Sequence, residues 1–275
     1  MASLKLARAS CAAVLAVAFA VVFGPGAGAQ QKKDDAKPSS RIQKKTYDFK
    51  DAGKEMEYAL FVPTNYDKAK KTPLVVALHG LGSNPQQIMR YRGLTDQAEK
   101  YGYVVVAPMG YNSGGWYGAQ FGKRKMDPEN LSELSEKDVM NVLDIVRKEY
   151  TIDPDRIYLM GHSMGGGGTW HLGIKYPDIW AGLAPIAPAV FRPAADVEKA
   201  RHIPVILVQG DADNLCPVAT ARRWVEQMKK LDMTYRYVEI AGGDHGSVAW
   251  KNMPEVFAFF DRHKRGEAAG PAAGQ

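Results

Sequence analysis

Residues 161–165 read Gly-His-Ser-Met-Gly, a spacing that sets one serine between two glycines. A short apolar stretch at 157–160 precedes them, and a glycine run leading into a helical pattern follows. A serine at such a strand-to-helix turn adopts a strained backbone and presents its hydroxyl above the sheet. Glycines on both sides leave the space that this sharp turn requires. The pattern therefore predicts Ser163 as a nucleophile.

A serine hydroxyl is a weak nucleophile until a base removes its proton, and an acid must orient that base. Of the six histidines, His245 lies in a glycine-rich loop after the last predicted strand. The chain order nucleophile, acid, histidine favours it as the base. The acid is expected in the loop after the preceding strand. Asp213 and Asp211 are the two candidates, and the spacing of Asp213 from Gly210 favours it. Asp211 would then brace the loop by hydrogen bonding.

The oxyanion that forms on attack needs preorganised N–H donors. The backbone N–H of Met164, the residue after the nucleophile, is one candidate, and that of Leu81 in the loop 79–82 is the other. His79 in the same loop is predicted to be structural, because no cluster of residues with metal-ligand spacing accompanies it. We expect neither a metal ion nor a cofactor.

The elements that must position these residues alternate between strand and helix. The predicted strands are 46–50, 56–62, 73–78, 103–107, 157–160, 183–187, 205–208 and 235–240. Helical patterns cover 94–101, 139–146, 169–176, 224–231 and 248–263. This alternation predicts an α/β fold, a mostly parallel sheet of about eight strands with helices on both faces. Ligands bind at the carboxyl ends of the strands of such sheets, where Ser163 would lie.

The two ends of the chain differ from this domain in composition. Residues 1–29 carry Lys5 and Arg8 before an apolar run and end in small residues, the pattern of a secretory signal peptide. The polar residues 30–45 and the Gly/Ala-rich residues 264–275 are predicted to be disordered. One catalytic domain, 46–263, is thus expected in the periplasm or the medium, with no stable membrane anchor after cleavage.

The charge and cysteine content narrow the classes of partner. The formal net charge is +6, but basic and acidic residues are intermixed and no nucleic-acid-binding motif is present, so we expect no nucleic-acid partner. Of the two cysteines, Cys11 lies in the signal peptide. The exported chain would then keep only Cys216 and form no internal disulfide.

Together these motifs resemble the α/β-hydrolase fold. Within it they resemble the secreted esterases related to polyhydroxybutyrate depolymerases and feruloyl esterases, and the catalytic domain of prolyl oligopeptidase-type enzymes. The segments that carry the resemblance are 78–80, 153–158, 161–166 and 210–213. The resemblance implies ester hydrolysis through an acyl-enzyme at Ser163, with Asp213 and His245 completing the triad. Many of the secreted relatives carry disulfides, which sets this chain apart from the disulfide-bearing polyester-degrading branch.

The expected activity is that of a carboxylesterase on feruloyl, acetyl-sugar or polyester-type substrates. The alternatives are a serine peptidase of the prolyl oligopeptidase type and an acyltransferase on the same fold. Only residues 188–202 separate two predicted strands, which leaves no room for a large lid domain. The loop 109–125 carries Trp116 and Tyr117, which either bind an aromatic or sugar-linked acyl group or pack the loop onto the domain.

Overall fold

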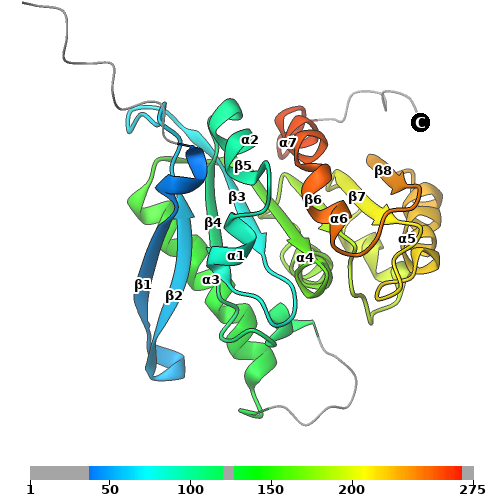
Figure 1. Ribbon diagram of the computed structural model, residues 1–275, viewed down its shortest axis with the longest axis horizontal. Coiled ribbons are helices and arrows are strands. Elements are labelled where there is room, and N and C mark those ends of the chain that lie inside the picture. The colour runs from blue at the N-terminus through cyan, green and yellow to red at the C-terminus, as the bar shows by residue number, and fades with distance from the viewer. Residues whose placement is uncertain (1–36, 120–126, 268–275) are drawn as a thin grey trace, which may run out of the picture. The chain divides into compact units, whose positions relative to one another are not determined.

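The computed structural model of the chain describes residues 37–119 and 127–267 (Figure 1). Its centre is one eight-stranded sheet in the order β1-β2-β4-β3-β5-β6-β7-β8. The strands are β1 Gln43–Phe49, β2 Lys54–Phe61, β3 Thr72–Leu78, β4 Val104–Pro108, β5 Ile152–His162, β6 Gly182–Ile186, β7 Val205–Gly210 and β8 Tyr235–Ile240. β1 and β2 pair antiparallel to their neighbours, and the strands from β4 to β8 are parallel. The predicted fold class is confirmed.

Helices cover both faces of this sheet (Figure 1). The α-helices are α1 Pro85–Met89, α2 Leu94–Tyr101, α3 Leu131–Glu149, α4 Met164–Lys175, α5 Val218–Lys230, α6 Ser247–Lys251 and α7 Met253–Asp261. The 3-10 helices are η1 Pro38–Arg41, η2 Lys50–Ala52, η3 Trp116–Gly118 and η4 Ala194–Ala200. Within 37–119 and 127–267, no helix combines the length and apolar character needed to cross a bilayer.

The alternation of side chains along β3 divides the core into two layers. Leu74, Val76 and Leu78 face the layer formed with α3, α4 and α5. Val75 and Ala77 face the layer formed with α1, α2, α6 and α7. All five side chains are fully buried, which explains why β3 is apolar without interruption.

The ordered domain begins before the predicted boundary at residue 46. η1 and the first residues of β1 fall inside the segment that the sequence predicts to be disordered. Arg41 forms an ion pair with Glu99, and Gln43 pairs with Leu60 of β2. These partners are remote in sequence, so the polar composition of the segment gives no sign of them. The predicted signal peptide, 1–29, lies outside the described residues.

The far end of the domain also departs from prediction. The single closing helix expected over 248–263 is divided into α6 and α7 at Asn252. Pro254 lies in the first turn of α7, and because proline lacks an N–H it cannot continue the hydrogen bonding of α6. Past α7, Arg265 Nη2 donates to Asp155 Oδ1 at 2.7 Å, so described structure extends into the predicted tail.

Candidate active site

Ser163 occupies a strained turn between β5 and α4. Its φ is 59° and its ψ is −116°, a backbone conformation that costs free energy for any residue other than glycine. A Cβ on Gly165 would lie 2.0 Å from the carbonyl oxygen of Leu78, and one on Gly161 would lie 2.2 Å from that of Gly165. Only glycine fits at these two positions. Ser163 directly follows the last residue of β5 and therefore lies at the carboxyl edge of the sheet.

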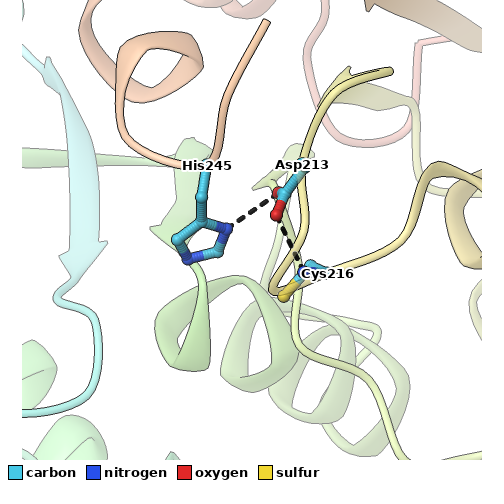
Figure 2. Close-up of side chains that lie close together, drawn as sticks. All are labelled: Asp213, Cys216 and His245. Atoms are coloured by element: carbon cyan, nitrogen blue, oxygen red, sulfur yellow. Dashed lines mark hydrogen bonds and ion pairs between the residues drawn. The ribbon is translucent and has the colours of Figure 1, made fainter.

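Asp213 and His245 meet at this edge from the loops after β7 and β8. Figure 2 shows the imidazole of His245 pointing at the Asp213 carboxylate. His245 Nδ1 lies 2.8 Å from Asp213 Oδ2, and the Asp213 side chain is fully buried. The pair has the geometry in which a carboxylate fixes the tautomer of a histidine and leaves Nε2 to accept a proton.

The Asp213 carboxylate is held by further N–H donors. Oδ1 accepts from the backbone N–H groups of Leu215 at 2.9 Å and Cys216 at 2.8 Å, and Oδ2 accepts from Gln209 Nε2 at 3.1 Å. Burial by itself raises the pKa of this carboxyl, but the hydrogen bonds from Cys216 and His245 outweigh it and hold the pKa below its usual range. Asp213 is therefore ionised at neutral pH.

Two other acidic side chains near His245, Asp211 and Asp244, accept hydrogen bonds from backbone N–H groups. Asp211 Oδ1 accepts from the N–H of Gly242 at 2.6 Å, which ties the loop after β7 to the loop that carries His245. Asp244 Oδ1 accepts from the N–H groups of Gly246 at 3.0 Å and Ser247 at 2.7 Å. Asp211 thus has the bracing contact that the sequence suggested as its alternative role.

His162 is a site residue that sequence reasoning did not assign. Its Nε2 lies 2.8 Å from the carbonyl oxygen of His245, and its Nδ1 lies 3.0 Å from the Tyr91 hydroxyl. Burial lowers the pKa of His162 to about 4, so the ring is neutral at neutral pH. Because the carbonyl oxygen can only accept, Nε2 carries the proton and Nδ1 accepts from Tyr91. The sequence signal was its place beside the nucleophile, but no local pattern pointed to its partners.

The loop after β3 lies against the elbow. A Cβ on Gly80 would lie 3.5 Å from Cβ of Ser163. Gly82 N–H donates to the Ser113 carbonyl oxygen at 2.8 Å, whereas the N–H groups of Leu81 and Met164 have no hydrogen-bond partner among the described residues. These two amides are the ones that the sequence proposes for the oxyanion.

A hydrogen-bonded network fixes this loop from behind. Tyr117 is fully buried, and its hydroxyl donates to the carbonyl oxygen of His79 at 3.1 Å. His79 Nε2 lies 2.9 Å from the carbonyl oxygen of Met109, and its Nδ1 lies 2.8 Å from that of Gly80. Trp116 is 9 % exposed and packs edge-on against Phe191. Tyr117 therefore packs the aromatic loop onto the domain; residues 120–125 of that loop lie outside the described residues.

Asp213, Cys216 and His245 each offer one atom that could bind a metal ion, and these three atoms lie within 4.8 Å of one another. Their chemistry does not suit one. Both Asp213 oxygens already accept protein hydrogen bonds, and burial raises the pKa of the Cys216 thiol to about 12, so the thiol is protonated. The cluster fits an acid–histidine pair with a buried cysteine beside it.

Comparison with known proteins places the chain in a family. The family model Esterase, described as "Putative esterase", matches residues 50–255. The chain belongs to this esterase family. It is 32 % identical over 148 residues to the protein named "Putative esterase NocK" of Nocardia uniformis subsp. tsuyamanensis, a match that covers 53 % of this chain and 41 % of the relative.

A second relative, feruloyl esterase B of Thermothelomyces thermophilus, is 27 % identical over 158 residues. The match covers 56 % of this chain and 51 % of the relative. The chain thus spans about half or less of the curated relatives it matches. A solved structure of a thermostable esterase superposes with a TM-score of 0.67 at 27 % identity, covering 83 % of this chain and 64 % of that one. The fold is that of the α/β-hydrolases.

Proposed function

We propose that the protein is a carboxylesterase that cleaves ester bonds through an acyl-enzyme at Ser163. The observation that carries this proposal is the 2.8 Å contact of His245 Nδ1 with the buried Asp213 carboxylate, made beside the strained elbow of Ser163. Membership of the esterase family supports the reaction class.

In the proposed reaction, Ser163 Oγ attacks the ester carbonyl carbon while Nε2 of His245 takes the hydroxyl proton. Asp213 keeps Nδ1–H of His245 in place and stabilises the imidazolium that forms. Collapse of the tetrahedral intermediate breaks the bond to the alcohol oxygen, which leaves with the proton from Nε2. Water then attacks the acyl-enzyme with His245 again as the base, and the acid is released.

The negative oxygen of both tetrahedral intermediates is assigned to the N–H groups of Leu81 and Met164. Gly80 brings the Leu81 backbone near the serine, and Met164 is the first residue of α4, so its N–H lies at the positive end of the helix dipole. One such donor typically contributes about 10²–10³ in rate. The rigid attachment of this loop through His79, Tyr117 and Ser113 supports this assignment, because a donor must be in place before charge develops.

The decisive experiment compares wild type with Ser163→Ala. Wild type should hydrolyse p-nitrophenyl esters far faster than peptide anilides and should be labelled by a fluorophosphonate probe. Ser163→Ala should abolish both signals while unfolding at a similar temperature. Labelling that persists in the variant would show that another residue is the nucleophile. Faster turnover of anilides than of esters would favour a peptidase.

We also propose that residues 1–29 are removed on export to the periplasm or the medium. The charged start, apolar run and small residues of that segment support this proposal. N-terminal sequencing of the exported protein should then begin at Gln30, and a protein retained in the cytoplasm with Met1 would contradict it.

A further inference from the structure

Among the described residues, four large apolar side chains are exposed, and all four follow the carboxyl ends of parallel strands of the sheet, after β3, β6, β7 and β8. They are Leu81, Phe191, Leu215 and Trp250, with exposed fractions of 61, 51, 74 and 39 %. We call them the apolar rim. Exposed apolar residues scattered singly over a surface need no explanation, but their restriction to one edge marks an interaction site.

Three members of the apolar rim adjoin groups of the proposed site directly. Leu81 carries one of the proposed oxyanion donors, and the Leu215 N–H donates to Asp213 Oδ1. Trp250 packs against Tyr91 with ring centroids 6.0 Å apart, and the Tyr91 hydroxyl bonds His162. Phe191 follows Ala189, whose N–H donates to the Ser163 carbonyl oxygen at 2.9 Å.

The apolar rim lies over both layers of the core. Phe191 packs on Trp116, which belongs to the layer with α3, α4 and α5. Trp250 packs on Tyr91, which belongs to the opposite layer. The rim therefore has members on both sides of the sheet edge.

The carboxylates of the same loops accept hydrogen bonds from backbone N–H groups. Asp211 accepts from Gly242 N–H, and Asp244 accepts from Gly246 and Ser247 N–H. Asp211, Asp244 and Lys251 are exposed beside the apolar rim, so charged groups flank it.

We propose that the apolar rim seats the surface of an aggregated apolar ester, so that the enzyme acts at an ester–water interface. This inference rests on the proposed function and names the physical form of its substrate. Contact with the interface buries the four side chains around the nucleophile, and the free energy of that burial holds the enzyme where ester bonds are concentrated.

Tributyrin tests the proposal because the same ester bond is available below its solubility limit as dissolved molecules and above it as emulsion droplets. The measured quantity is the ratio of the two rates. For wild type we expect the rate to rise steeply once droplets appear. For Phe191→Gln combined with Trp250→Gln we expect the ratio to fall about tenfold, which corresponds to about 1.4 kcal/mol.

Tyr235→Gln, an aromatic change at the amino end of β8 and so far from the site, is the matched control and should keep the wild-type ratio. A wild-type rate that does not rise with droplets, or a double variant with the wild-type ratio, would overturn the proposal. Failure of wild type to hydrolyse dissolved tributyrin would instead count against the proposed esterase activity, which keeps the two questions separate.

Discussion

The carbonyl oxygen of His245 accepts a hydrogen bond from His162 Nε2 at 2.8 Å, so the residue before Ser163 holds the backbone of the proposed base. The two rings also pack with centroids 4.8 Å apart. Since His162 ends β5 and is buried, it gives the long loop of His245 a rigid reference beside Ser163. The distance between nucleophile and base thus depends on this one contact as well as on Asp213.

We expect His162→Leu to lower kcat about tenfold to a hundredfold with little change in KM. Loss of the hydrogen bond from Nε2 to the His245 carbonyl oxygen displaces the base but leaves the substrate contacts in place. His162→Gln, whose amide N–H can still donate to the carbonyl oxygen, should recover part of the loss. Steady-state kinetics on p-nitrophenyl acetate measure both.

Tyr91→Phe is the matched control for that pair. It removes the hydroxyl that bonds Nδ1 of His162 but leaves the Nε2–H contact available, so its kcat should lie between those of wild type and His162→Leu. If His162→Leu and His162→Gln lost kcat equally while unfolding at the wild-type temperature, His162 would have no positioning role.

Asp213→Asn should lower kcat by about 10⁴, because an amide in place of the carboxylate favours the wrong tautomer of the histidine. Asp211→Asn should cost much less, since the amide oxygen can still accept from Gly242 N–H. The two kcat values on one ester decide the assignment, and a larger loss for Asp211→Asn would exchange the roles of the two acids.

Glu136 gives a prediction on stability against pH. It joins α3 to α4 through Lys175 Nζ at 2.5 Å, the Tyr176 hydroxyl at 2.5 Å and His171 Nε2 at 2.8 Å. Burial raises the pKa of this carboxyl, but those donors outweigh it and lower the pKa from 4.5 to about 2. The stabilisation linked to this shift is about 3 kcal/mol.

Because the folded-state pKa is the lower one, that stabilisation is complete above about pH 4.5 and is lost as the pH falls toward 2. Glu136→Gln should therefore unfold with a free energy about 3 kcal/mol below wild type at pH 7, and the difference should shrink in acid. Urea denaturation at several pH values measures it. A difference that does not change with pH would show that the charge of Glu136 contributes nothing.

Gly165→Ala should destabilise the fold by about 3 kcal/mol, because the added Cβ would meet the backbone of Leu78, which cannot turn aside as a side chain does. Gly53→Ala is the control. It has open space and a φ of +61°, so only the left-handed backbone penalises it, by about 1 kcal/mol. Thermal unfolding should rank the two variants in this order, and equal losses would contradict the steric argument.

Local pattern was enough to predict much of the sheet. The apolar run at 73–78 became β3, buried along its whole length, and the glycines around Ser163 marked a turn that only they can form. The approach of Asp213 to His245 was also predictable, because parallel strands bring the loops after β7 and β8 to the same edge. In each case the information lies within a few residues of the feature or in the order of the strands.

Contacts between distant residues were not predictable in this way. Aromatic residues in a glycine-rich loop suit substrate binding and packing equally, and only the burial of Tyr117 and its bond to His79 separate the two. The early start of the domain likewise depends on Arg41 reaching Glu99.

The sequence by itself determined the elbow of Ser163, the strands that carry it and the two residues proposed to activate it, because steric exclusion and hydrophobic periodicity act over short stretches of chain. Only the tertiary structure decided that His162 holds the His245 loop, that Asp211 is a brace, and which apolar side chains after the parallel strands stay exposed. These features arise where loops from separate strands meet, and that meeting is set by the packing of the whole sheet.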